Sequence, residues 1–272
     1  MMRAVTLLLI FLVFISTSRA DETRPYQFGV FPYLSPVTMN NLYSPVASQL
    51  SSSLNFPVQF RTSSTFNRFL AKLRNEYYDF ALIQPFWYPV AVDQHSYIPA
   101  VRMQEPFESL ILVLDDSPYR TIDDLKNTTI AAPPSFVPVV HMARQALIDN
   151  DIKPGRDFSF NHFKSVDSCL QQVLIGKASA CVAPPFAPAV FEKNMKVKLR
   201  TLLRSKSIPN LSLVIHPRVP EKHRQTITSA FLSWKSSPRY KQLLENMQTE
   251  GFVRIIDSEY NSVRDFIKSL KK

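Results

Sequence analysis

The chain has 272 residues, of which 45% are hydrophobic and 20% charged, a balance that excludes a disordered chain and allows two folded lobes. Its formal net charge of +10 favours anionic partners. The lysines and arginines are nevertheless scattered without a dense basic run, so the sequence predicts no nucleic-acid partner. With 4 glycines in the chain, a phosphate-binding loop built from glycines is not expected either.

The first twenty residues, 1–20, are predicted to be a secretory signal peptide. Arg3 leads into a nearly continuous apolar run that is too short to cross a bilayer comfortably. Ser18 and Ala20 then supply the small residues that a signal peptidase reads. We therefore expect cleavage after Ala20 and a periplasmic protein, and no cysteine follows the signal that could carry a lipid anchor.

Strand-like and helix-like runs alternate through the next part of the chain. Strands are predicted at 26–31, 56–62 and 79–83, with helical spacing around 43–50, 66–73 and 86–92. Such alternation predicts a mainly parallel sheet with helices on both faces.

This pattern changes at two strand-like runs, 97–102 and 109–114, which have no helix between them. The connection is too short for a parallel crossover within one sheet, so we expect the chain to pass into a second lobe. That lobe is predicted to contain strands at 129–132, 158–163 and 178–182 and helices at 138–149 and 167–174.

A return to the first lobe is predicted at the polar connector 205–210, which lies between two further strand-like runs. Three helical stretches, 221–235, 238–248 and 259–270, would then pack back on the first lobe. The predicted fold class is therefore α/β, with two lobes joined by two hinge crossings and a ligand cleft at the carboxyl ends of the strands. The predicted boundaries are 21–107 with 208–272 for lobe 1, and 108–207 for lobe 2.

The strongest candidate for ligand binding is the elbow between the strand at 129–132 and the helix that follows. Pro138 suits the first helical turn, and Ser135 lies just ahead of it. Backbone N–H groups and the positive end of the helix dipole can hold an anion at such a position. The alternative is that Ser135 only caps the helix.

Other polar residues also follow predicted strands, and each has a structural alternative. Tyr33 could face the cleft or pack on the neighbouring prolines. Thr62 and Ser63 could offer hydroxyls to a ligand, although helix capping would account for one of them. Gln84 could contact the ligand or only fix its loop, and Ser165 precedes another predicted helix start.

The remaining chemistry-bearing residues give few signals. Cys169 and Cys181 would lie at the same edge of an α/β unit in an oxidising compartment, where both a disulfide and free thiols are possible. The 5 histidines show no metal-ligand spacing, and no nucleophile elbow is present. We therefore expect no metal, no cofactor and no enzymatic activity.

Four segments in this order, 28–36, 78–85, 121–126 and 167–178, resemble the substrate-binding proteins of phosphate, phosphite and phosphonate ABC importers. The resemblance implies the type II periplasmic binding protein fold, in which two lobes close around a ligand and dock on a membrane permease. It also implies oxyanion contacts from a tyrosine after the third strand and from a hydroxyl at the second-lobe elbow. Tyr88 and Ser135 occupy those positions here.

The chain departs from the phosphonate-binding pattern at several of its positions. Val166 stands where a histidine precedes the aspartate of the last motif, and Ser179 stands where an aspartate is common. Phe136 follows Ser135 where the family elbow reads Ser-Thr-Ser-Gly. A pocket with Val166 and Phe136 is drier, which would favour a smaller or less charged ligand.

These observations predict a monomeric periplasmic solute-binding protein that delivers a small oxyanion of the phosphate, phosphite or phosphonate type to an ABC permease. The alternative is a secreted two-lobed module that senses a ligand for a membrane receptor or kinase, or assists a periplasmic enzyme, without transport. A relative that binds no ligand is the third hypothesis, suggested by Val166 and Ser179.

Overall fold

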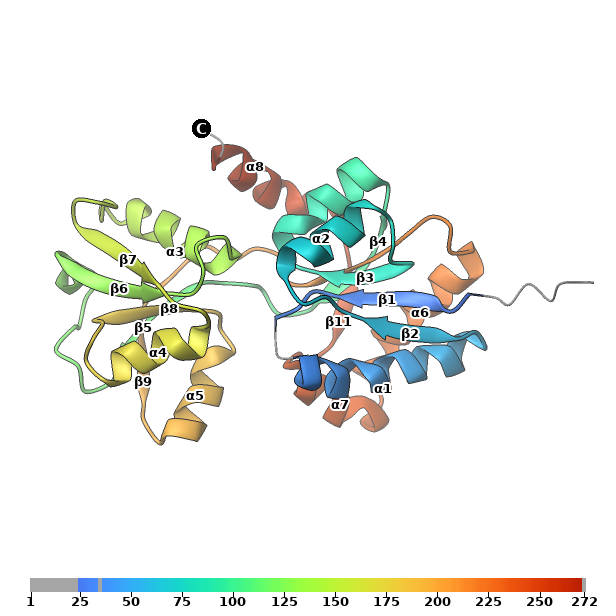
Figure 1. The fold of residues 1–272 in the computed structure, drawn as a ribbon, viewed down its shortest axis with the longest axis horizontal. Helices are drawn as coiled ribbons and strands as arrows, with labels where there is room; N and C mark the ends of the chain where they lie inside the picture. Colours follow the sequence, from blue (N-terminus) through green and yellow to red (C-terminus); the bar gives the residue numbers. More distant parts are fainter. Residues whose placement is uncertain (1–23, 34–35, 271–272) are drawn as a thin grey trace, which may run out of the picture.

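The computed structural model describes residues 24–33 and 36–270 and contains two β-sheets. The six-stranded sheet has the order β11-β4-β10-β3-β1-β2, and the five-stranded sheet has the order β7-β6-β8-β5-β9. Each sheet is flanked by its own helices, and two connections run between the two parts (Figure 1). The predicted signal peptide, residues 1–20, lies outside the described residues.

The six-stranded sheet draws its strands from both ends of the described chain. They are β1 (Tyr26–Val30), β2 (Val58–Arg61), β3 (Phe80–Ile83), β4 (Ile98–Met103), β10 (Ser212–Ile215) and β11 (Phe252–Arg254). The helices of this part are α1 (Pro36–Leu54), α2 (Phe66–Arg74), α6 (Glu221–Trp234), α7 (Lys241–Met247) and α8 (Asn261–Ser269). Shorter turns of helix are η1 (Pro85–Trp87), η2 (Val90–Gln94), η4 (Pro238–Tyr240) and η5 (Asp257–Tyr260).

The five-stranded sheet is built from the middle of the chain. Its strands are β5 (Leu110–Leu114), β6 (Thr128–Ala132), β7 (Phe158–His162), β8 (Ala180–Ala183) and β9 (Leu199–Arg204). Its helices are η3 (Asp123–Leu125), α3 (Pro138–Asp149), α4 (Val166–Leu174) and α5 (Ala187–Met195).

Three strands of each sheet form a parallel unit, and the remaining strands pair antiparallel with their neighbours. β1 pairs in parallel with β2 and β3, while β6 pairs in parallel with β7 and β8. The first unit is β1-α1-β2-α2-β3 and the second unit is β6-α3-β7-α4-β8. Because β10 joins β3 and β5 joins β8 antiparallel, the predicted mainly parallel sheets are in fact mixed. Only strands linked by helical crossovers have to keep their direction, and the strands beside the crossings are not linked in that way.

The two crossings predicted from the sequence connect β4 to β5 and β9 to β10. They pair with each other, since the Phe107 and Ile208 N–H groups donate to each other's carbonyls at 2.8 and 2.9 Å. One step further, the Ser109 N–H donates to Ser205 Oγ at 2.9 Å. The passage between the sheets is therefore a short two-stranded ladder, with far fewer contacts than a sheet.

The apolar core is continuous in the six-stranded part and divided in the five-stranded part. One cluster, containing Phe28, Tyr78, Phe80 and Trp234, spans the six-stranded sheet. The five-stranded sheet separates its buried residues into one cluster under α3 and another under α4. In the described residues, no helix combines the length and apolar character needed to cross a membrane.

Some local predictions differ from the structure. The stretch 86–92, predicted as one helix, is divided into the 3₁₀ turn η1 and the π-type turn η2, and Pro89 at the N-cap of η2 lacks the N–H that a continuous helix would use. Helix α5 and strand β11 were not predicted from the sequence, and β11 has only 3 residues, too few for a recognisable alternation.

Candidate functional site

The segments that follow the parallel strands of the two sheets meet each other. Phe66, at the start of α2, packs edge-on against Phe136 in the β6–α3 elbow, with ring centroids 5.5 Å apart. Phe86 in η1 lies 6.3 Å from His141 in α3, measured in the same way. We call this region, where residues after β1, β2 and β3 approach residues after β6, the junction. Open α/β sheets bind ligands at this end of their strands.

Ser135 lies at the junction with its hydroxyl available. The side chain is exposed, and among the described residues it has no hydrogen-bond partner. Helix α3 begins at Pro138, and its N-cap residue Val137 makes no side-chain capping bond. Within residues 24–33 and 36–270, no side chain accepts from the first-turn N–H groups of α3, although the Val140 N–H donates to the Val137 carbonyl at 3.1 Å. Ser135 therefore does not cap the helix.

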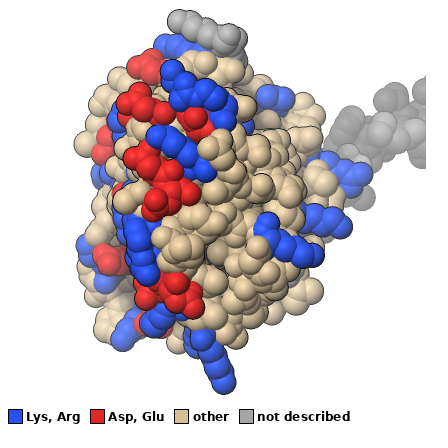
Figure 2. Space-filling model, turned by 90° about the vertical axis from the view of Figure 1, so that its left-hand side faces the viewer, with Lys and Arg blue, Asp and Glu red and all other residues tan. Residues whose placement is uncertain are grey.

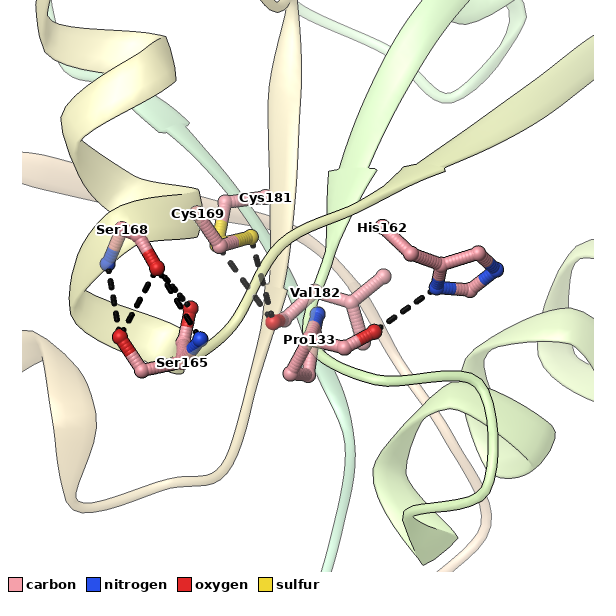
Figure 3. The surroundings of a disulfide bond; sticks show 7 residues. All are labelled: Pro133, His162, Ser165, Ser168, Cys169, Cys181 and Val182. Atoms are coloured by element: carbon pink, nitrogen blue, oxygen red, sulfur yellow. Dashed lines mark hydrogen bonds between the residues drawn. A yellow bond between two sulfur atoms is a disulfide. The ribbon is translucent and has the colours of Figure 1, made fainter.

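The elbow is held from the neighbouring strand. His162, the last residue of β7, bonds through Nδ1 to the carbonyl oxygen of Pro133 at 2.8 Å (Figure 3). A carbonyl oxygen only accepts, so Nδ1 carries the proton in this contact. This bond fixes the start of the segment that presents Ser135.

Ser165 lies at the start of the next helix and is engaged there. Its Oγ accepts from the Ser168 N–H at 3.1 Å, and its own N–H donates to Ser168 Oγ at 3.0 Å, which together form a capping box. One turn further along α4, Cys169 is joined by a disulfide to Cys181 in β8, with the Cα atoms 5.7 Å apart (Figure 3). The disulfide fixes α4 to the sheet beneath it.

Tyr88 is buried rather than exposed at the junction. Its hydroxyl donates to Asp257 Oδ1 at 2.8 Å, and its ring stacks on Tyr260 with centroids 3.6 Å apart. Burial, and then the hydrogen bond to Asp257, raise the pKa of Tyr88 well above its ordinary value. The hydroxyl is occupied by the C-terminal segment, and its contact with a ligand stays a prediction.

Some of the remaining predicted residues have a hydrogen-bond partner in the protein, and one does not. The Tyr33 hydroxyl bonds to that of Tyr43 at 2.7 Å, and burial raises the pKa of Tyr33 to about 12. Thr62 donates to the Val30 carbonyl at 2.9 Å, and Ser63 lies 3.4 Å from the Tyr78 hydroxyl. Within the described chain the Gln84 side chain has no bonding partner. Ser135 and Gln84 thus keep free polar groups.

Aromatic residues at the junction were largely missed by sequence reasoning. Phe66 packs 6.2 Å from Phe31 and 6.1 Å from Trp87, measured between ring centroids. Each of these rings follows a strand or a polar elbow residue within a few positions, as Phe136 follows Ser135. Because aromatic residues recur at these positions, the sequence could have predicted that aromatic side chains line the junction.

A separate hollow of about 500 Å³ lies at the opposite end of the five-stranded sheet, at the amino ends of β6 and β8. There the Ser179 hydroxyl donates to the Tyr119 hydroxyl at 2.9 Å. Ser179 therefore lies at the other end of the strands from the junction.

On the outer face of the five-stranded part, charged side chains of both signs form a band along one side, and most of the rest is uncharged (Figure 2).

Metal chemistry has no support in the part of the chain that the structure describes, where no group of three or more His, Cys, Asp or Glu residues could hold an ion. The site is instead one of hydroxyl, amide and aromatic groups. Such groups can bind and orient a small molecule through hydrogen bonds and apolar contacts.

Comparison with protein families matches residues 28–260 to the family of ABC transporter phosphonate periplasmic substrate-binding proteins. The chain belongs to this family. Its members are periplasmic solute-binding proteins, as the resemblance implied. A search of curated proteins finds no match.

Solved structures share the fold of this family member at low sequence identity. PhnD1 from Prochlorococcus marinus, in complex with methylphosphonate, has a TM-score of 0.75 at 16% identity, covering 91% of this chain and 98% of PhnD1. A binding protein component of an ABC phosphonate transporter from Pseudomonas aeruginosa gives 0.74 at 15%, with coverages of 91% and 87%. The aliphatic sulphonate binding protein SsuA from Escherichia coli gives 0.65 at 11%, again with coverages of 91% and 87%. The type II periplasmic binding protein fold is thereby confirmed.

Proposed function

We propose that this protein, as a periplasmic monomer, captures a small phosphorus oxyanion at the junction and delivers it to an ABC importer. The observation that carries the proposal is the exposed hydroxyl of Ser135, which has no hydrogen-bond partner among the residues that the structure describes, beside a helix start without a side-chain cap. A hydroxyl and first-turn N–H groups solvate an oxyanion through charge-assisted hydrogen bonds, and the helix dipole adds to this attraction.

Two further groups support the same position for the ligand. The Gln84 amide is available on the opposite side of the junction, and Lys164, exposed just before α4, offers a positive charge. The hydroxyls of five other candidate residues already have protein partners, so a ligand role for any of them requires an exchange of bonds on binding: Tyr33, Tyr88, Thr62, Ser63 and Ser165.

Lobe closure is part of the proposal. We take residues 21–107 with 208–272 as one lobe and 108–207 as the other, turning about the paired crossings. The Phe66–Phe136 and Phe86–His141 ring contacts would form and break in this motion, because they join residues of different lobes. Closure would shield the oxyanion from water and create the surface that an importer recognises.

The proposal is tested by a thermal-shift and calorimetric screen of the mature protein against methylphosphonate, phosphite, phosphate and sulfate. A ligand at about one hundred times its dissociation constant adds roughly 2.7 kcal/mol to the folded state, which is readily seen as a raised melting midpoint. A rise with a phosphorus oxyanion is the expected result. A cooperative melt that none of these anions shifts would contradict the proposal.

Delivery to an importer needs a separate measurement. We expect that cells lacking this protein lose uptake of the phosphorus compound that binds it, and that the wild-type gene restores uptake. Binding without any change in uptake would favour the alternative function, in which the protein senses its ligand for a receptor or serves a periplasmic enzyme.

A further inference from the structure

Phe136 is the most exposed aromatic ring at the junction. It is 59% exposed although it packs against Phe66, so a large apolar surface remains uncovered beside Ser135. Exposed apolar surface of this kind marks a binding region when it lies next to free polar groups. Because Ser135 and Phe136 are consecutive residues, a ligand whose charged group reaches Ser135 brings its remaining atoms close to Phe136.

The ring of Phe136 contacts an aromatic cluster of the other sheet, in which Phe31 is buried while Phe66 and Trp87 keep part of their surface exposed. Phe66 contacts Phe136, and its other neighbours are Trp87 and Phe31, at centroid distances of 6.1 and 6.2 Å. Exposed aromatic surface therefore lies on both sides of the junction instead of at a single side chain.

The segments 31–33, 62–66, 84–88, 133–137 and 163–166 include no Asp or Glu. Two carboxylates adjoin them: Asp167 lies in the first turn of α4, and Asp257 accepts from the Tyr88 hydroxyl and pairs with Arg264. An ammonium group brought beside Ser135 and Phe136 finds no counter-ion on the elbow itself and would lose water, which is unfavourable. An apolar ring would instead gain aromatic contacts and bury surface on both sides.

Resting on the proposed function, we propose that the natural ligand is a phosphonate with an apolar, planar substituent, of the arylphosphonate class. Ser135 and the start of α3 hold the phosphonate oxygens. Phe136 and Phe66 pack on the substituent, and closure of the lobes completes the aromatic enclosure. The family elbow has small polar residues, and this chain has Ser135-Phe136 there. In this proposal, Phe136 causes the preference for an aryl substituent.

The test compares three probes by calorimetry on the mature protein: phenylphosphonate, methylphosphonate and 2-aminoethylphosphonate. Phenylphosphonate is expected to bind about tenfold more tightly than methylphosphonate, because a ring adds aromatic contacts and buried area. We expect 2-aminoethylphosphonate to bind no more tightly than methylphosphonate.

The Phe136→Ala variant tests whether Phe136 contacts the substituent of the ligand and not its phosphonate oxygens. The variant should lose most of the roughly tenfold advantage of phenylphosphonate while methylphosphonate affinity changes by less than about twofold. Ile175→Ala is the matched control, since Ile175 is 55% exposed in the same part of the molecule but lies at the far end of α4. It should change neither affinity.

Four outcomes overturn the inference. Methylphosphonate binding without a gain for phenylphosphonate, or an equal loss of both ligands in Phe136→Ala, removes the substituent preference and leaves the proposed function standing. Tighter binding of 2-aminoethylphosphonate than of phenylphosphonate does the same. If no phosphonate binds a protein that melts cooperatively, the inference and the proposed function both fail.

Discussion

The first and second parallel units have the same order of elements but hold their second helix in different ways. Both helices begin with a hydroxyl cap: Thr65 accepts from the Arg68 N–H at 3.2 Å, and Ser165 accepts from the Ser168 N–H at 3.1 Å. In the first unit, Phe69 of α2 stacks on two buried or partly buried rings of the large core. In the second unit, the Cys169–Cys181 disulfide joins α4 to β8.

This difference follows from the size of the two cores. The six-stranded part buries one large aromatic cluster, whereas the five-stranded part has two smaller clusters on opposite faces of its sheet. A small core supplies less stabilisation, and a covalent link compensates for it. Covalent support matters most where binding requires a fixed geometry, and α4 lies beside the elbow that presents Ser135.

Removing the disulfide should produce the largest effect. Replacing both cysteines by alanine is expected to lower the free energy of unfolding by about 3 kcal/mol, because the link closes a short loop in the unfolded chain. Denaturant unfolding measures the change, and wild-type protein unfolded under reductant should show a similar loss. An unchanged unfolding midpoint in both experiments would mean that the second unit does not depend on the link.

Ser135→Ala tests the helix start that lacks a cap. We expect the affinity for a bound phosphonate to fall about tenfold or more, since a hydrogen bond to a charged group is worth roughly 1.5–3 kcal/mol. The free energy of unfolding should stay within about 0.5 kcal/mol of wild type, because Ser135 is exposed and its side chain bonds to none of the described residues. Calorimetry and denaturant unfolding give the two values, and a stability loss with unchanged affinity would indicate a structural role instead.

Ser165→Ala is the matched variant at the helix start that has a cap. Loss of the capping box is expected to cost about 1 kcal/mol of stability, while phosphonate affinity changes by less than about twofold. The same two measurements apply. A fall in affinity as large as that of Ser135→Ala would show that Ser165 leaves its cap to bind the ligand, and the contrast between the two helix starts would be lost.

Much of the fold could be predicted because its signals are local. The alternation of apolar strands with helical spacing identified both parallel units, and the absence of a helix between 97–102 and 109–114 identified the first crossing. The antiparallel strands around β10 depend on how two distant segments pair. That pairing is a tertiary choice that no local pattern encodes.

Strand ends mark the elbows, so Ser135 and Tyr88 were expected after strands, and they follow β6 and β3 in the structure. Their contact with a ligand stays a prediction, and the bonding state of each side chain could not be predicted from the sequence. Whether a hydroxyl is free depends on partners far away in sequence: Asp257 is 169 residues from Tyr88. Sequence reading also treated hydroxyls as the main signal and gave little weight to the aromatic residues beside them.

Tyr88→Phe should give the smallest effect of these variants on stability and affinity taken together. It tests how the first parallel unit is held. Tyr88 bonds to the C-terminal segment through Asp257, and the second unit has no such added segment. Loss of this bond is expected to cost about 0.5 kcal/mol, at the low end for a hydrogen bond, because Asp257 is largely exposed and keeps its contact with Arg264. Phosphonate affinity should change by less than about twofold.

The pH dependence sharpens this last prediction. Arg264 first, and the Tyr88 hydroxyl in addition, lower the pKa of Asp257 below its ordinary value. A lowered carboxyl pKa stabilises the folded state above the unfolded pKa of about 4, and this stabilisation is lost as the pH falls through the folded pKa. Urea unfolding should therefore show the difference between wild type and Tyr88→Phe at pH 7 and a smaller difference near pH 3. If affinity falls instead while this pH-dependent difference is absent, the Tyr88 hydroxyl serves the ligand and not the C-terminal segment.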